Sequence, residues 1–421
     1  MNLETARQET IQRLQDLTGD GGTVPGIQYV VVTADKVLLS HASGVQDMGF
    51  VGDGNGNGNG SDASSNNAVT ESTTFLSSST TKVLTALGIW KLVDQGKVKL
   101  EDPLSDYYPQ HPYDDDNGDG SKNIVRVRHL LNQTSGIPNP LPLTWLHTVE
   151  EHDSYSAETE EAFLQEQLQK YAKPDFAAGS KYAYSNLSYW LLGKVIEKAS
   201  GVSYRNYMRT EVFDPLGIPA EELDCEIPCL DEHAHGHQPR FSMLTLFFWL
   251  LAPSKLWDFN ANGWCRFQTL YMNGAPYGGM NGTAMGYAKV LQHLLGLLTE
   301  EDSDDKAPPS TTLFSSPKES ISQMFATQQG GPDGTEEMPV TLGGWHIGYK
   351  ETTGGDSNNA ATDKYFYKCG GGPGYSSNVR LYPRQGIATV YLCNTTQVSE
   401  TPINALSDEL DPAILGCITV E

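Results

Sequence analysis

The chain has 421 residues, which is enough for two or three domains with sizeable cores. A hydrophobic content of 38% and a mean hydropathy of -0.40 are those of an ordinary globular protein. The net charge of -24 argues against nucleic acid or an anionic membrane as partner, because a protein that binds either presents a basic face.

The ends and apolar runs of the chain bear on its location. Residues 1–7 lead into a polar amphipathic helix and lack the apolar centre of a signal peptide. The longest apolar run, residues 243–252, is about half of a membrane span. We therefore expect a cytoplasmic protein with no membrane span and with its six cysteines reduced.

The N-terminal part alternates between helix and strand patterns. Residues 4–18 have a helical pattern, and Gly26–Thr33 and Val37–His41 predict two strands of a hairpin. Residues 52–67, rich in Gly, Asn and Ser, predict a mobile insertion.

A long apolar helix follows, in which Val83, Leu84, Leu87, Trp90 and Val93 recur at steps of three and four. Its expected caps are Ser77 or Ser78 at the start and Gly96 at the end.

Ser79 and Lys82 then lie one turn apart on the same side of this helix. A hydroxyl beside an amine is a nucleophile beside its own base. The helix dipole and burial would both lower the pKa of the lysine. The same spacing occurs at Ser303/Lys306 and Ser315/Lys318, but neither pair opens a long apolar helix. Alone, the pattern more often marks a capping serine and a solvated lysine.

The remaining elements suggest a discontinuous arrangement. Helical periodicity covers residues 126–133, 158–171, 188–199, 203–212, 284–298 and 317–327, strand patterns cover 341–349, 364–368, 377–382 and 387–392, and a last helix covers 400–410. We expect an α+β fold in which residues 1–75 and 320–421 form a domain with an antiparallel sheet flanked by helices. Residues 76–319 would form a second, mainly helical domain, with insertions at about 109–123 and 225–270. A site fed by distant segments would lie where the two meet.

Two further segments carry chemistry. Tyr184-Ser185-Asn186 precedes a helix, where a tyrosine hydroxyl can exchange a proton with a nucleophile. The run from Lys368 through Cys369 to Gly370, Gly371 and Gly372 ends a strand, where free N–H groups can bind a substrate oxygen. Each has a plain structural alternative, a half-buried aromatic and a glycine-rich turn. Tyr-x-Asn also occurs at Tyr204/Asn206 and Tyr271/Asn273.

Together, Ser-x-x-Lys, Tyr-x-Asn and Lys-x-Gly in this order resemble the serine β-lactamase and penicillin-binding protein superfamily. The chain is most similar to the class C β-lactamase-like branch that includes family VIII carboxylesterases. Residues 127–137, 214–218 and 278–284 match as well, so the resemblance runs from about Pro25 to Asn394. It implies a β-lactamase/transpeptidase-like fold.

The resemblance implies Ser79 as nucleophile, Lys82 as its base and Tyr184 as the proton-exchanging group. It implies substrate binding by Asn186, Lys368, Gly370 and Gly371, with an oxyanion hole made by the N–H groups of Ser79 and Gly371. Two residues depart from the pattern. Cys369 stands where lactamases usually have threonine, and Lys368 stands where related esterases often have His or Trp.

Two more segments are open to interpretation. Cys225, Cys229, His233, His235 and His237 could hold one zinc ion, although their spacing matches no standard site. Residues 241–251 are apolar nearly all round, which is typical of a core helix or a subunit contact and would also suit a wall of an acyl pocket.

The resemblance and the surviving motifs imply a serine hydrolase that cleaves small-molecule carboxylic esters through a covalent acyl-enzyme, with no cofactor. The alternatives are a β-lactamase, a D-amino-acid peptidase or amidase, an acyltransferase with the same nucleophile, and a non-catalytic binding protein. The oligomeric state stays open.

Overall fold

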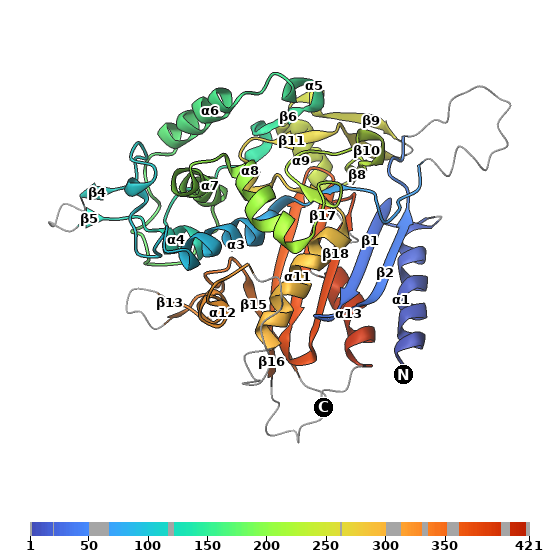
Figure 1. The fold of residues 1–421 in the computed structure, drawn as a ribbon. Helices are drawn as coiled ribbons and strands as arrows, with labels where there is room; N and C mark the ends of the chain where they lie inside the picture. The colour runs from blue at the N-terminus through green and yellow to red at the C-terminus, as the bar shows by residue number, and fades with distance from the viewer. Residues whose placement is uncertain are drawn as a thin grey trace.

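The computed structural model describes residues 2–19, 21–49, 67–116, 122–261, 263–299, 313–330, 336–351, 362–396 and 405–417. At its centre is a six-stranded antiparallel sheet in the order β15-β16-β17-β18-β1-β2 (Figure 1). The strands are β1 (Gly26–Val32), β2 (Val37–Gly44), β15 (His346–Glu351), β16 (Thr362–Gly372), β17 (Tyr375–Tyr382) and β18 (Ile387–Cys393). Val30 lies opposite Val390 between β1 and β18, so strands from the two ends of the chain share one sheet, as expected.

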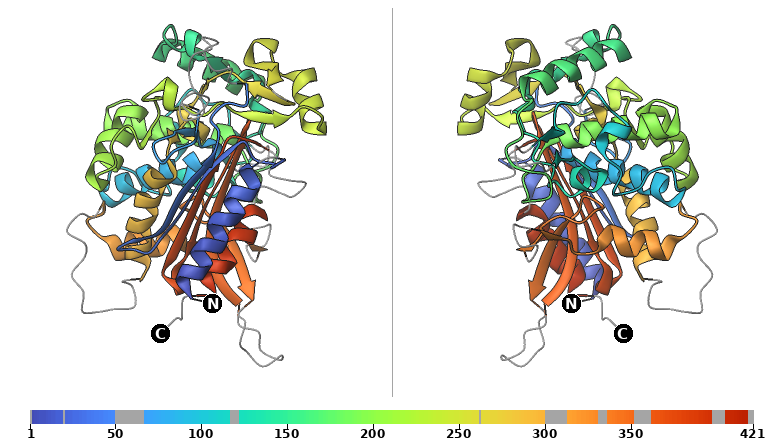
Figure 2. Two further views of the ribbon diagram at one scale, coloured as in Figure 1. Left: turned by 90° about the vertical axis from the view of Figure 1, so that its right-hand side faces the viewer. Right: turned by 90° about the vertical axis from the view of Figure 1, so that its left-hand side faces the viewer.

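Helices cover both faces of this sheet. On one face, α1 (Leu3–Thr18) and α13 (Ala405–Leu415) lie side by side (Figure 2). On the other face, α11 (Ala284–Thr299) packs against β1 and β18. Successive side chains of β1 alternate between the two cores, and every residue of β1 is therefore buried.

The mainly helical part of the chain lies beyond one end of the sheet (Figure 1). Its helices are α3 (Thr81–Asp94), α4 (Val127–Leu131), α5 (Val149–His152), α6 (Ala157–Lys170), α7 (Asn186–Ser200), α8 (Tyr204–Tyr207), α9 (Met243–Leu251), α10 (Ala275–Gly278) and α12 (Pro317–Phe325). Short strands join these helices: β3 (Phe75–Leu76), β4 (Asp115–Asp116), β5 (Lys122–Asn123), β6 (Leu146–Thr148), β7 (Leu223–Asp224), β8 (His237–Pro239), β9 (Trp257–Ala261), β10 (Trp264–Phe267), β11 (Leu270–Met272), β12 (Asn281–Gly282), β13 (Gln329–Gly330) and β14 (Glu336–Glu337). This α+β architecture agrees with the predicted fold class, whereas the domain boundaries stay a prediction.

Several predicted boundaries were wrong. The strand expected from residue 341 begins at His346, because Thr341 to Trp345 form a turn in which Gly344 has a φ of 76°. The last helix extends to Leu415, five residues past its predicted end at 410, and residues 400–404 lie outside the described part. The proposed insertion at 52–67 lies outside it too, except for Asn67.

Helix α9 is more exposed than a core helix, which was one of the interpretations that the sequence left open. Phe248 is buried and meets the ring of Phe267 edge-on at 5.5 Å. Trp249, Leu250 and Leu251 are 57%, 65% and 52% exposed. An apolar groove runs along α9, but none of the seven predicted site residues lines it. No helix in the described ranges is long and apolar enough to span a membrane.

We expect Phe248→Ala to lower the free energy of unfolding by about 3–5 kcal/mol, because it leaves a cavity beside Phe267. Trp249→Ala should change it by less than about 0.5 kcal/mol, because that side chain is mainly exposed. Thermal unfolding of the two variants measures the difference. Equal destabilisation would show that α9 is covered on both sides in solution.

Candidate active site

The segment that carries Ser79 is a 3-10 turn, Ser78–Thr80, immediately before α3. Neither Ser77 nor Ser78 caps the helix as predicted, since the N-cap position is Thr80 and no side chain caps it. The Ser77 hydroxyl instead donates to the carbonyl of Met280 at 2.7 Å. Ser79 therefore lies just outside the helix that the sequence predicted for it.

Ser78 has a left-handed backbone, with a φ of 52°. Few residues other than glycine adopt this conformation, and a strained backbone persists only where the surroundings enforce it. The side chain of Ser78 is buried, and its hydroxyl has no hydrogen-bond partner among the described residues. This turn presents the partly exposed Ser79 to the space in front of the buried helix.

Three predicted site residues meet at the Ser79 hydroxyl. Its oxygen lies 2.7 Å from the Tyr184 hydroxyl and 3.3 Å from Nζ of Lys82. Nζ of Lys82 also donates to Oδ1 of Asn186 at 2.8 Å and to the carbonyl of Tyr277 at 2.6 Å. The predicted group from two distant segments is thus brought together by direct contacts.

The amine of Lys82 is 0% exposed and makes no ion pair with any described carboxylate. Burial lowers the pKa of Lys82 well below its ordinary value, and the charge of Lys368 lowers it further. A neutral amine has two N–H groups and one lone pair. If the two N–H groups serve Asn186 and Tyr277, the lone pair remains for the hydroxyl of Ser79.

Tyr184 is positioned by a tight connection before α7. The N–H groups of Ala183 and Ser185 donate to the backbone carbonyl and to Oε1 of Gln133, at 2.9 and 2.6 Å. Gln133 itself has a left-handed backbone, with a φ of 62°. Burial raises the pKa of Tyr184, and the bond to Ser79 offsets this only in part, so the phenol carries its proton at neutral pH.

Strand β16 forms the other wall of the site. Gly370 packs so closely on the Ser79 turn that an added Cβ would lie 2.5 Å from the carbonyl of Ser77 and 2.9 Å from the nitrogen of Ser79. The exposed Gly371 follows it at the end of the strand. Lys368 is 2% exposed, and its Nζ lies 5.2 Å from the centre of the Tyr184 ring.

The pKa of Lys368 is lowered to about 8 by burial, against a smaller opposite effect of Cys369. Nζ of Lys368 lies 3.3 Å from Nε2 of His346. Burial and the charge of Lys368 lower the pKa of His346 to about 3, so this imidazole is neutral and can accept the bond. The site therefore holds two lysines and no described carboxylate in contact with either.

The proposed zinc ligands do not assemble. Among the described residues, no group of three or more His, Cys, Asp or Glu side chains could hold a metal ion. Nδ1 of His233 pairs with the Thr74 hydroxyl at 2.9 Å, and Nε2 of His237 accepts from the N–H of Met48 at 3.1 Å. Tyr204, the tyrosine of another Tyr-x-Asn triplet, forms its hydrogen bond with the hydroxyl of Thr85 at 2.7 Å and not with Ser79.

Three contributors to the site were not predicted from the sequence: the Tyr277 carbonyl, Gln133 and His346. Gln133 lies in a segment that carried the resemblance, so its place near the site had a signal. The Tyr277 carbonyl and His346 had no such signal. A sequence does not show which backbone carbonyl will face a site, and His346 lies outside every motif that carried the resemblance.

A family model described as Beta-lactamase matches residues 8–410. The chain belongs to the Beta-lactamase family. This match covers most of the chain and agrees with the resemblance to the serine β-lactamase and penicillin-binding protein superfamily.

Two curated relatives of this Beta-lactamase family chain match only in part. Penicillin-binding protein 4* of Bacillus subtilis (strain 168) is 33% identical over 140 residues, which are 33% of this chain and 28% of that protein. Protein flp of Staphylococcus aureus (strain N315) is 27% identical over 209 residues, 50% of this chain and 37% of flp. The matches thus span about a third of the length of these relatives.

Solved structures extend the similarity to the whole chain. The octameric penicillin-binding protein homologue from Pyrococcus abyssi has a TM-score of 0.62 at 22% identity. The superposition covers 97% of this chain and 77% of the Pyrococcus chain. The D-alanine carboxypeptidase AmpC from Burkholderia cenocepacia has a TM-score of 0.63 at 18% identity and covers 99% of both chains. At these identities the similarity shows the fold alone.

We expect Gly370→Ala to slow labelling of Ser79 by a fluorophosphonate about 100-fold, because the new methyl group displaces the Ser79 turn. Mass spectrometry of the labelled peptide measures the rate. Gly296→Ala is the control, since its Cβ would meet only Cβ of Ala34 at 3.7 Å. Unchanged labelling of Gly370→Ala would show that β16 does not support the turn.

Proposed function

We propose that this Beta-lactamase family protein is a serine hydrolase that cleaves carboxylic esters through a covalent acyl-enzyme on Ser79. The observation that carries the proposal is the buried amine of Lys82, with acceptors for two N–H groups and Ser79 at 3.3 Å. Members of the family fold are serine hydrolases, which supports enzymatic activity.

Acylation uses the contacts around Ser79. Lys82 takes the hydroxyl proton as Ser79 attacks the ester carbonyl, and the N–H groups of Ser79 and Gly371 receive the oxyanion. The C–O bond to the alcohol then breaks, and the protonated Tyr184 gives its proton to the leaving alkoxide. Lys82 returns the proton to Tyr184 through water, and a second water then hydrolyses the acyl-enzyme by the same steps in reverse.

The preference for esters rests on what surrounds Lys368. A β-lactam or a peptide C-terminus brings a carboxylate, which Lys368 can attract, but the neighbouring Cys369 is a weak hydrogen-bond donor. An ester needs only attack, oxyanion stabilisation and protonation of the alkoxide. Hydrolysis of small esters is therefore the reaction for which the site supplies every group.

A β-lactamase or D-amino-acid peptidase is the second candidate. It is favoured by the buried cation of Lys368 beside Tyr184, which suits a substrate carboxylate. One structural neighbour, AmpC from Burkholderia cenocepacia, is a D-alanine carboxypeptidase.

We expect short-chain p-nitrophenyl esters to be hydrolysed readily and nitrocefin to react slowly or not at all. Ser79→Ala and Lys82→Met should each lower kcat/KM for the ester by about 1,000-fold or more, since one lacks the nucleophile and the other the base. Lys91→Met is a matched control, because Lys91 lies on the same helix and pairs with Glu211 instead. Wild-type activity of Ser79→Ala would refute the nucleophile, and nitrocefin turnover above that of every ester would refute the substrate class.

The pKa of Lys368, about 8, predicts that KM depends on pH for substrates that carry a carboxylate and not for neutral ones. Lys368 is protonated below that pH and neutral above it, so KM for a carboxylate-bearing ester should rise as the pH passes 8. KM for a neutral ester should stay constant over the same range. In Lys368→Met the two substrates should show the same pH dependence, and a persistent difference would assign the carboxylate contact to another group.

A further inference from the structure

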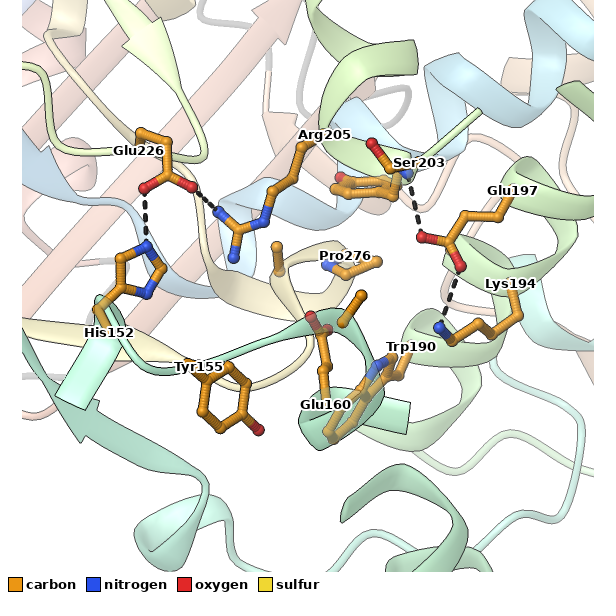
Figure 3. A pocket seen from close by; sticks show the side chains of 14 residues that line it. His152, Tyr155, Glu160, Trp190, Lys194, Glu197, Ser203, Arg205, Glu226 and Pro276 are labelled. Atoms are coloured by element: carbon orange, nitrogen blue, oxygen red, sulfur yellow. Dashed lines mark hydrogen bonds and ion pairs between the residues drawn. The ribbon is translucent and has the colours of Figure 1, made fainter. Parts of the chain in front are cut away.

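A second pocket lies in the helical part of the molecule, away from the residues that surround Ser79. It has a volume of about 300 Å³ and lies between α6, α7, α8 and α10 (Figure 3). None of the seven predicted site residues lines it. Its volume is at the lower end of the range for small-molecule sites, which limits the ligand to a few heavy atoms.

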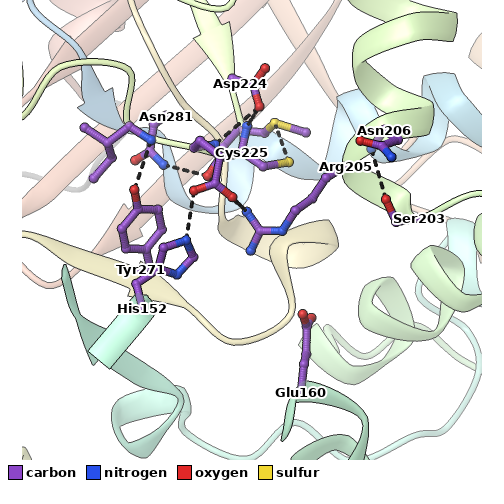
Figure 4. A network of polar contacts seen from close by, with 12 residues as sticks. His152, Glu160, Ser203, Arg205, Asn206, Asp224, Cys225, Tyr271 and Asn281 are labelled. Atoms are coloured by element: carbon purple, nitrogen blue, oxygen red, sulfur yellow. Dashed lines mark hydrogen bonds and ion pairs between the residues drawn. The ribbon is translucent and has the colours of Figure 1, made fainter. Parts of the chain in front are cut away.

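The charged residues of this pocket are paired, with one exception. Arg205 and His152 both contact Glu226 (Figure 4), and Lys194 pairs with Glu197. Glu160 makes no ion pair with any described residue, and its hydrogen bond on Oε1 comes from the N–H of Gly274 at 3.1 Å.

The carboxyl group of Glu160 points into the pocket toward Arg205 (Figure 3). Arg205 and Lys194 are near enough to lower the pKa of Glu160, yet burial outweighs them and raises it. The carboxyl group of Glu160 and the guanidinium of Arg205 thus face one another across the pocket without forming an ion pair.

Two buried polar atoms of the lining are also unsatisfied. The indole N–H of Trp190 and the hydroxyl of Tyr155 have no hydrogen-bond partner among the described residues. Trp190 is 1% exposed. Leaving such a group unpaired in the protein interior is unfavourable, and hydrogen bonds to a bound polar molecule would remove that penalty.

We propose that this pocket binds a small zwitterion of the amino-acid class. Its ammonium group contacts Glu160, whose carboxylate lacks a cation. Its carboxylate contacts the guanidinium of Arg205, whose hydrogen bonds to Cys225 and Glu226 are both made by Nη1. A short apolar side chain packs against Trp190 and Pro276. A molecule with both charges contacts both groups, whereas a cation alone would contact Glu160 and leave Nη2 of Arg205 unused.

The pocket shares a wall with the Ser79 site. The carbonyl of Pro276 accepts from the hydroxyl of Thr85, and the next carbonyl, that of Tyr277, accepts from Lys82. A ligand seated on Pro276 therefore contacts the segment that orients the candidate base. We expect occupancy to change kcat for the ester more than KM, a readout that rests on the proposed function.

Binding is tested directly by calorimetry on the full chain, which does not depend on activity. Both enantiomers of leucine are compared with 3-methylbutylamine and 4-methylpentanoate, each of which lacks one charged group. We expect one equivalent of at least one leucine enantiomer to bind, and each analogue to bind about tenfold more weakly or worse. No binding of either enantiomer at millimolar concentration, or equal binding of an analogue, would overturn the proposal.

Variants locate the binding. Glu160→Gln should weaken leucine binding about tenfold, whereas Glu166→Gln, exposed on the same helix, should not. Ala157→Phe places a ring at the exposed rim and should block entry without removing a buried group. Lys368→Met should leave the affinity unchanged. If Lys368→Met abolishes binding and Glu160→Gln does not, leucine occupies the Ser79 site and the proposal fails.

Discussion

A lysine amine buried without a carboxylate is the constraint on which the site depends. Burial disfavours a charged Lys82, and among the described residues its nitrogen contacts neutral oxygens, from Asn186, Tyr277 and Ser79, and no carboxylate. Those three oxygens come from α7, α10 and the Ser79 turn. The packing of α3 against α7 and α10 is therefore what determines the protonation state of Lys82 and the direction of its lone pair.

The electrostatics of the site contrast with those of the whole chain. The net charge is -24, yet the basic residues of the site are two lysines and a neutral histidine. Acidic side chains on the surface cannot pair with these amines because Lys82 and Lys368 are both buried. The long-range field favours cations, while the site itself favours a substrate that develops negative charge.

The sequence predicted the sheet, most helices and the grouping of Ser79, Lys82 and Tyr184. It did so because strand alternation, helical periodicity and short motifs are local signals. It could not predict the left-handed turn at Ser78, which is imposed by tertiary packing and carries no glycine. For helix α9 the sequence left a core helix, a subunit contact and a pocket wall open, because a helix that is apolar on nearly all sides does not show which face is buried. The sequence did not predict the pocket of Glu160 and Arg205, because the elements that form its walls share no motif.

The pairing of β1 with β18 has a consequence for how the chain is made. Ile27 lies opposite Cys393, so the middle of the sheet cannot close until residue 393 has left the ribosome. Until then β1 is an apolar strand that is paired only with β2 and lacks β18, and such strands are prone to pair with other chains. Contacts of this sequence separation also fold slowly. The fold that gathers its site from both ends of the chain is consequently one that relies on protection during synthesis.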